Sequence, residues 1–218
     1  MRVLLVDDEP LIRSGFRFVL SVDPSIEIVA EAADGSSAID MVRRHRPDVV
    51  LMDVRMPVMD GPQATEVIVA ESGARVLAMT SIDAEGQLMR MLIAGASGYL
   101  LKDEAPHRIL DAVRRTALGD TVFSAQSTAE LVRRAVDGEG GVGRRAATDR
   151  VAVLTDRERE VAVGVAAGET NQEIGVSLHI SAGTVKTHLE QIFAKLGVRN
   201  RVQVGVILER AGLGPADI

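Results

Sequence analysis

Acidic, hydroxyl and lysine side chains follow short apolar runs in the first half of the chain. The residues in these places are Asp7, Asp8 and Glu9, then Asp53, then Thr80 and Ser81, and finally Lys102. Carboxylates that face one another repel, and a hard divalent cation such as Mg²⁺ relieves that repulsion. One carboxylate can then attack a phosphoryl group and form an aspartyl phosphate, whose charge the metal, a hydroxyl and an ammonium would hold. Taken singly, an acid after a strand usually caps a helix and a lysine is usually solvated, so only their convergence indicates this chemistry.

Five apolar runs in the first half are separated by segments with helical periodicity. The runs cover residues 3–6, 26–32, 49–54, 75–81 and 98–102. Strands that alternate with helices predict a parallel sheet, and continuously apolar strands predict helices on both of its faces. This is a doubly wound, five-stranded α/β fold. Its sites form beyond the carboxyl ends of the strands, so the candidate residues are expected to meet at that edge.

The last third of the chain has only helical periodicity and repeated capping signals. Thr155, Thr170 and Asn200 each precede Glu or Gln by three residues, which is typical of a helix start. We expect a small all-α domain of four helices, the second and third of which form a helix-turn-helix. The four cover approximately residues 156–167, 171–178, 182–196 and 201–211. The outward face of the third helix is polar, which fits an ordinary solvated helix as well as a helix that reads DNA.

The length of 218 residues predicts two domains joined by a linker. We expect the first domain over residues 1–120, the linker over 121–149 and the second domain over 150–218. The first part of the linker has a helical pattern, and its end contains four glycines between residues 137 and 149.

The net charge of −6 hides a local excess of positive charge. Between residues 179 and 201, Glu190 is the one acid among the basic residues Lys186, Lys195, Arg199 and Arg201. The absence of cysteine excludes disulfides and thiolate ligands. No apolar run approaches the roughly 20 residues of a membrane span, and the first apolar run is too short for a signal peptide. We therefore predict a soluble cytoplasmic protein that makes no membrane contact.

The motifs "VLLVDDEPLIR", "LMDVRMPVMDG", "MTS" and "GYLLKD" occur in this order in the first 118 residues. In order and spacing they resemble the receiver domain of bacterial two-component response regulators, which has a flavodoxin-like fold. The resemblance implies that Asp53 is the phosphoacceptor, that Thr80 and Tyr99 switch with it, and that Lys102 is the counter-cation. It also implies a Mg²⁺ site made by Asp7, Asp8, Asp53 and the backbone carbonyl of Arg55. Val58 stands where many members have glycine, which puts the turn geometry in question.

The stretch "LTDREREVAVGVAAGETNQEIGVSLHISAGTVKTHLEQIFAKLGVRNRVQ" resembles the DNA-binding domain of LuxR type, joined to a receiver as in the NarL/FixJ regulators. The resemblance implies that helix 182–196 enters the major groove and that helix 201–211 helps to form a homodimer. The DNA contacts that it implies are Thr184, Lys186, Thr187, His188, Lys195 and Arg199. Glu190 lies where several members have a neutral or basic residue. It would weaken binding near phosphates unless it accepts a hydrogen bond from a cytosine amine.

The combined prediction is a transcription regulator that a sensor histidine kinase phosphorylates on Asp53 and that binds double-stranded promoter DNA as a dimer. It would be a switch and not a turnover enzyme. A DNA-binding regulator with an inert receiver, controlled by protein contacts, is the alternative. A dinucleotide-binding domain is disfavoured, because "DDEP" follows the first strand where that domain has a glycine-rich turn. A haloacid-dehalogenase-type phosphatase is disfavoured, because Arg55 stands where that enzyme has a second acid, two residues after its aspartate nucleophile.

Overall fold

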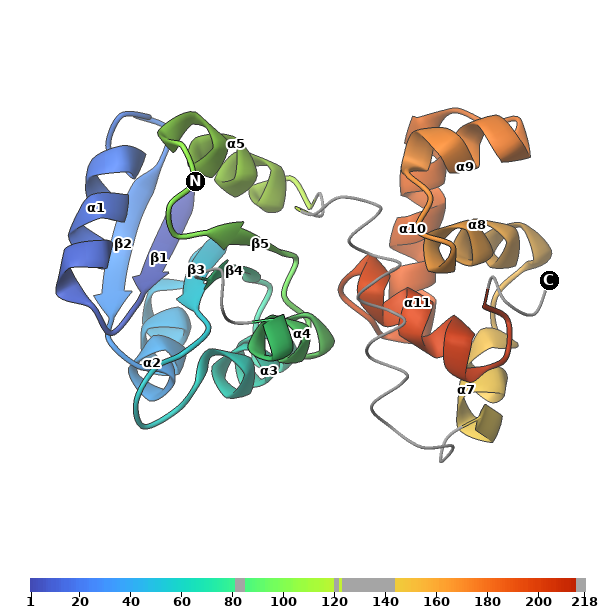
Figure 1. The fold of residues 1–218 in the computed structure, drawn as a ribbon, viewed down its shortest axis with the longest axis horizontal. Helices are drawn as coiled ribbons and strands as arrows, with labels where there is room; N and C mark the ends of the chain where they lie inside the picture. The colour runs from blue at the N-terminus through green and yellow to red at the C-terminus, as the bar shows by residue number, and fades with distance from the viewer. Residues whose placement is uncertain (81–84, 120–121, 123–143, 215–218) are drawn as a thin grey trace. The chain divides into compact units, whose positions relative to one another are not determined.

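The chain forms two compact units, Met1–Val122 and Phe123–Ile218 (Figure 1). The computed structural model describes residues 1–80, 85–119, 122 and 144–214. Ser81, the predicted helical part of the linker and the glycines that follow it lie outside the described residues. Within the described ranges, every helix is too short or too polar to cross a membrane.

A parallel five-stranded sheet forms the centre of the first unit, in the order β2-β1-β3-β4-β5. The strands are β1 (Arg2–Val6), β2 (Glu27–Ala32), β3 (Val49–Asp53), β4 (Arg75–Thr80) and β5 (Gly98–Leu101). Each begins and ends within one residue of the apolar run that predicted it. The strand order is that of flavodoxin-like doubly wound folds, so the predicted fold class is confirmed. Strand β3 lies at the centre of the sheet and all five of its residues are buried.

Helices cover both faces of the sheet (Figure 1). The helices are α1 (Pro10–Leu20), α2 (Gly35–His45), α3 (Gly61–Glu71), α4 (Glu85–Ile93) and α5 (Pro106–Ala117). Phe16 and Leu20 of α1 and Ile109 and Val113 of α5 share a core with alternate strand residues, while α2, α3 and α4 cover the opposite face. Burial on both faces explains why the strands are continuously apolar.

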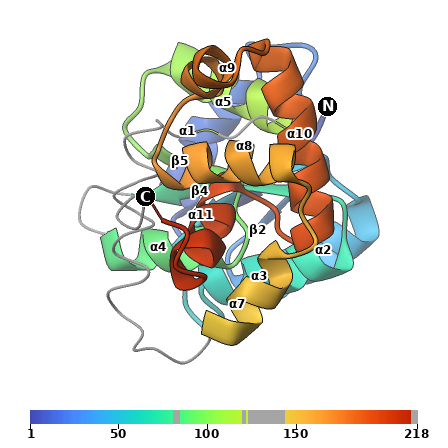
Figure 2. The ribbon, with the colours of Figure 1, turned by 90° about the vertical axis from the view of Figure 1, so that its right-hand side faces the viewer.

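The second unit is helical throughout its described part (Figure 2). Its helices are α7 (Arg144–Val151), α8 (Asp156–Ala166), α9 (Asn171–Leu178), α10 (Ala182–Leu196) and α11 (Arg201–Arg210). The side chains of Thr155, Thr170, Ser181 and Asn200 accept hydrogen bonds from backbone N–H groups in the first turns of α8, α9, α10 and α11. The four predicted helices are therefore confirmed to within one residue.

Helix α7 corrects the predicted linker. Its first residues, 144–149, were assigned to a linker without secondary structure after the glycines. Ala147 and Val151 are buried in the core of the second unit, and Arg150 donates a hydrogen bond to the carbonyl oxygen of Leu196. These long-range contacts stabilise a helix whose sequence has little apolar periodicity. The second unit therefore includes residues before 150, and its described part has one helix beyond the four predicted.

Val58 adopts a left-handed backbone conformation, with φ 65°, in the loop between β3 and α3. It is a β-branched residue and its side chain is 90% exposed, so no packing compensates for the steric cost. We expect Val58→Gly to raise the free energy of unfolding of the first unit by about 1 kcal/mol, after the entropy cost of glycine is included. Urea denaturation followed by fluorescence of Tyr99, the single tyrosine, measures this unit without the second.

Val22→Gly is the matched control, because Val22 is also exposed but does not have a positive φ. That variant is expected to lose stability. If both variants lose stability to the same extent, the left-handed conformation of Val58 is not strained.

Candidate functional site

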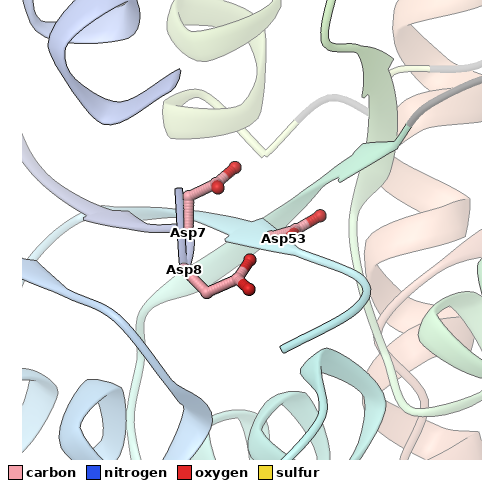
Figure 3. A group of neighbouring side chains, drawn as sticks. All are labelled: Asp7, Asp8 and Asp53. Atoms are coloured by element: carbon pink, nitrogen blue, oxygen red, sulfur yellow. The ribbon is translucent and has the colours of Figure 1, made fainter. Parts of the chain in front are cut away.

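Three carboxylates meet at the carboxyl edge of the sheet. Asp7 and Asp8 follow β1, and Asp53 ends the neighbouring strand β3 (Figure 3). One oxygen from each lies within 4.8 Å of the other two. Asp7 is fully buried and Asp53 is 4% exposed, whereas Asp8 is exposed. The adjacency of β1 and β3 thus places two buried carboxylates beside an exposed one.

Lys102 is the cation that offsets this charge. Its Nζ lies 2.9 Å from Oδ2 of Asp7 and 3.1 Å from Oδ2 of Asp53, and Glu9 is 3.9 Å away. Burial disfavours the ammonium form, but the hydrogen bond with Asp7 and the charge of Asp53 outweigh it and raise the pKa of Lys102. The lysine therefore stays charged and links the ends of β1, β3 and β5.

Asp53 has an unusually high pKa for an aspartate. Burial and the neighbouring charge of Asp7 raise the pKa of Asp53 to about 6, although Lys102 and the N–H of Val54 act in the opposite direction. The Val54 N–H donates to Oδ1 at 2.8 Å. Gly61 begins α3 so close to this strand end that a Cβ at position 61 would lie 2.2 Å from the carbonyl oxygen of Asp53. The glycine is therefore required for the chain to fold back against the site.

Three other predicted residues lie around this edge. Thr80 is buried at the end of β4, and the N–H of Lys102 donates to its carbonyl oxygen at 2.9 Å. Tyr99 is half-buried in β5, opposite Ala78. Arg55 is exposed in the loop after β3. Thr80 thus ends the strand next to Asp53, Arg55 lies two residues after Asp53 in the loop, and Tyr99 lies further from the edge.

The donor set suits a hard divalent cation such as Mg²⁺, because every candidate ligand is a carboxylate or carbonyl oxygen. Oδ2 of Asp7 is buried, and its partner among the described residues is the Lys102 ammonium at 2.9 Å, which leaves this carboxylate oxygen a further lone pair. A buried acceptor with spare capacity at the centre of an acidic cluster is what a metal ligand requires. The residues present therefore fit the predicted ion.

The helix-turn-helix consists of α9 and α10, joined at His179, Ile180 and Ser181. His179 ends α9 in a left-handed conformation, with φ 55°. A Cβ at Gly175 would lie 2.7 Å from the carbonyl oxygen of Ile180, so the turn packs directly against α9. Val185, Leu189, Ile192 and Leu196 form the buried face of α10.

The predicted DNA-contacting residues differ in their surroundings. Thr184, Thr187 and Arg199 are exposed, and Lys186 and His188 are half-buried. Lys195 donates to the buried carboxylate of Glu158 at 2.6 Å, and this carboxylate also accepts hydrogen bonds from the N–H and hydroxyl of Thr155. The Lys195 hydrogen bond is the main cause of the lowered pKa of Glu158. Lys195 thus joins α10 to α8, a role that the sequence did not reveal.

Comparison with known proteins identifies the family. The chain matches the "Response regulator receiver domain" over residues 3–114 and "Bacterial regulatory proteins, luxR family" over residues 152–208. The chain belongs to the response regulators. This response regulator is 39% identical over 207 residues to the nitrate/nitrite response regulator protein NarP of Escherichia coli, with 94% of this chain and 93% of NarP covered. It is 36% identical to the transcriptional regulatory protein LiaR of Bacillus subtilis, with 96% and 97% covered.

Solved structures give the same result. The crystal structure of the response regulator ChrA of a heme-sensing two-component system is similar over 97% of this chain and 98% of ChrA, with 34% identity and a TM-score of 0.53. The receiver domain of the response regulator NarL of Mycobacterium tuberculosis matches 54% of this chain and 96% of that domain, with 40% identity and a TM-score of 0.52. The response regulator therefore combines a receiver with a LuxR-type DNA-binding domain and controls transcription.

The raised pKa of Asp53 predicts a pH-dependent effect of Asp53→Asn on the stability of the response regulator. In metal-free buffer, the charge of Asp53 destabilises the folded state because its pKa is higher there than in the unfolded chain. The effect is complete above the folded pKa of about 6 and absent below the unfolded pKa of about 4. Asp53→Asn should therefore raise the free energy of unfolding by about 2 kcal/mol at pH 7.5, and this gain should disappear as the pH falls to 4. Urea denaturation followed by Tyr99 fluorescence measures both.

Asp40→Asn on α2 controls for the loss of one exposed carboxylate. A gain in the Asp53 variant that is equal at pH 4 and pH 7.5 would contradict the proposed charge repulsion.

Proposed function

We propose that this response regulator is a phosphorylation switch in which Asp53 accepts a phosphoryl group from a sensor histidine kinase. One observation carries the proposal: Lys102 contacts the buried carboxylates of both Asp7 and Asp53 at the carboxyl edge of the sheet, beside the exposed Asp8. Such a cluster destabilises the fold, because each carboxylate disfavours the charge on the next. Groups perturbed in this way are concentrated at functional sites. The similar proteins NarP and ChrA are both named as response regulators, which supports the same function.

Each residue has a distinct role in the proposed transfer. An oxygen of Asp53 attacks the phosphorus of a phosphohistidine, the P–O bond forms, and the P–N bond breaks with its electrons going to the imidazole. Lys102 and the hydroxyl of Thr80 hold the phosphoryl oxygens, and Tyr99 moves inward with Thr80. Asp7, Asp8, Asp53 and the carbonyl of Arg55 would hold Mg²⁺. When bound, the ion supplies the positive charge that lets two anionic groups approach.

The proposed output is binding of the second unit to promoter DNA as a homodimer. The exposed polar side of α10 would enter the major groove, with α11 at the dimer contact. Thr184, Lys186, Thr187, His188 and Arg199 would contact the DNA. Lys195 is less suited to this role than the sequence suggested, because Glu158 already neutralises its charge. The receiver would catalyse only its own phosphorylation and dephosphorylation, so the protein is a switch without turnover of a free substrate.

Phosphorylation on Asp53 is tested with acetyl phosphate and Mg²⁺. Wild-type protein should gain one acid-labile phosphoryl adduct by intact-protein mass spectrometry, and Asp53→Asn should gain none, because the amide is a poor nucleophile. Circular dichroism of the variant establishes that it folds. Undiminished labelling of Asp53→Asn would remove Asp53 from its role, and an unlabelled wild type would favour the inert receiver.

DNA binding through α10 is tested with Lys186→Ala on a mixed-sequence DNA duplex. Loss of one phosphate contact should weaken binding about three- to tenfold at low salt and reduce the slope of log affinity against log salt concentration by about one. Fluorescence anisotropy of the labelled duplex measures both. Arg44→Ala, which removes an exposed charge from α2, should leave both unchanged. If Lys186→Ala also leaves both unchanged, the DNA-binding surface lies elsewhere.

A further inference from the structure

Four contacts hold Asp7 among the described residues. Its N–H donates to the carbonyl oxygen of Ala32 at 3.2 Å, and its Oδ1 accepts from the N–H of Glu9 at 2.9 Å. Its Oδ2 faces Lys102. Its own carbonyl oxygen accepts from Nη1 of Arg13 at 2.5 Å. The first three contacts follow from the strand, the helix start and the ion pair, but the fourth comes from a charged side chain one turn into α1.

Arg13 is itself fixed by β2. Its Nε donates to Oε2 of Glu31 at 3.2 Å, and the side chains of Arg13 and Glu31 are 18% and 24% exposed. Arg17 donates to the other oxygen of Glu31 from Nε at 2.7 Å. Glu31 directly precedes Ala32, whose carbonyl holds the N–H of Asp7. Strand β2 therefore holds the backbone of Asp7 at two points. Ala32 binds its N–H directly, and Glu31 holds its carbonyl through Arg13.

The direction of the Arg13 contact is unexpected for a cation beside three carboxylates. An unconstrained guanidinium would form a bidentate pair with Asp7 or Asp8 and so occupy the oxygens that a metal needs. In the described contacts of Arg13, its partners are instead the Asp7 carbonyl and Glu31. Glu31 neutralises the guanidinium and keeps it on the peptide side of the turn. The carboxylates stay available.

We propose that Arg13 is a positioning residue for the metal-binding turn, which it fixes by holding the Asp7 carbonyl while Glu31 keeps its charge away from the carboxylates. Arg13 thereby sets the direction of the Asp7 and Asp8 side chains. Outer partners of this kind commonly determine the affinity of a metal site. The inference rests on the proposed function, because it assumes that the cluster binds Mg²⁺.

The sign of the effect separates positioning from simple electrostatics. Removing a positive charge next to an acidic cluster should strengthen the binding of a divalent cation if only charge matters. Removing a group that aims the ligands should weaken binding. Arg13→Met is the sharpest variant, because methionine keeps an apolar stem in the half-buried position and lacks every hydrogen-bond donor.

The experiment titrates the full chain with Mg²⁺ by isothermal calorimetry, and with Mn²⁺ by electron paramagnetic resonance as a second probe. Arg13→Met should raise the dissociation constant about tenfold. Arg13→Lys keeps a hydrogen-bond donor and the positive charge, so its dissociation constant for Mg²⁺ should rise clearly less. Arg43→Ala is the matched control, since it removes an exposed arginine that pairs with Glu71 in the same unit, and its affinity should not fall.

The Mg²⁺ dependence of the rate of phosphorylation by acetyl phosphate distinguishes weaker metal binding from a loss of stability. Arg13→Met should need more Mg²⁺ for half-maximal rate but should approach the wild-type rate at saturating Mg²⁺. Unchanged or tighter Mg²⁺ binding by Arg13→Met overturns the proposal, as do equal losses in Arg13→Met and Arg13→Lys. If the wild type still binds Mg²⁺, either of these results contradicts only the role of Arg13 and not the proposed phosphorylation switch. A wild type without saturable Mg²⁺ binding overturns the metal site and the positioning role together.

Discussion

The repulsion between Asp7 and Asp53 is the constraint on which the receiver depends. The two buried carboxylates lie at the ends of adjacent strands and repel each other. This repulsion raises the pKa of Asp53, and a nearby cation is needed to offset it. The fold supplies Lys102, from the end of β5, and leaves one side of the cluster open. The sheet order makes this arrangement unavoidable, because β1 and β3 are neighbours and their carboxyl ends coincide. Lys102 neutralises this site only in part, so the site can accept further positive charge.

The second unit solves a different problem, which is to hold one helix in a fixed orientation. Ser181 caps the start of α10 and Gly197 ends it in a left-handed conformation. Near its end, Lys195 is tied to Glu158 at the start of α8, and the carbonyl of Leu196 accepts from Arg150 of α7. Loss of Lys195 would leave the buried carboxylate of Glu158 without its cation, so the pair ties α10 to α8. A helix fixed at both ends loses little conformational entropy when it binds a partner.

Local sequence signals predicted most of the fold. Continuous apolar runs gave the strands, and the capping pairs at Thr155, Thr170 and Asn200 gave the helix starts. The convergence of the acids followed from the rule that parallel strands share a carboxyl edge. Helix α7 was missed, because its stability comes from packing and not from its own periodicity.

Side-chain partners distant in sequence were beyond the reach of these signals. The pairing of Lys195 with Glu158 spans 37 residues, and the link between Arg13 and Glu31 depends on the register of β2 against β1. At Val58 the sequence indicated only a departure from a common glycine. The structure adds that Val58 has a positive φ, the conformation in which glycine carries no steric cost.

The central claim is that this acidic cluster forms an acyl phosphate on one particular carboxylate. Borohydride reduces an acyl phosphate to an alcohol, so treatment of acetyl-phosphate-labelled protein converts the phosphorylated aspartate to homoserine. Peptide sequencing by tandem mass spectrometry then locates it. The account predicts homoserine at position 53 alone, formed with Mg²⁺ and not with a chelator. Homoserine at position 7 or 8, or at none of the three, would contradict it.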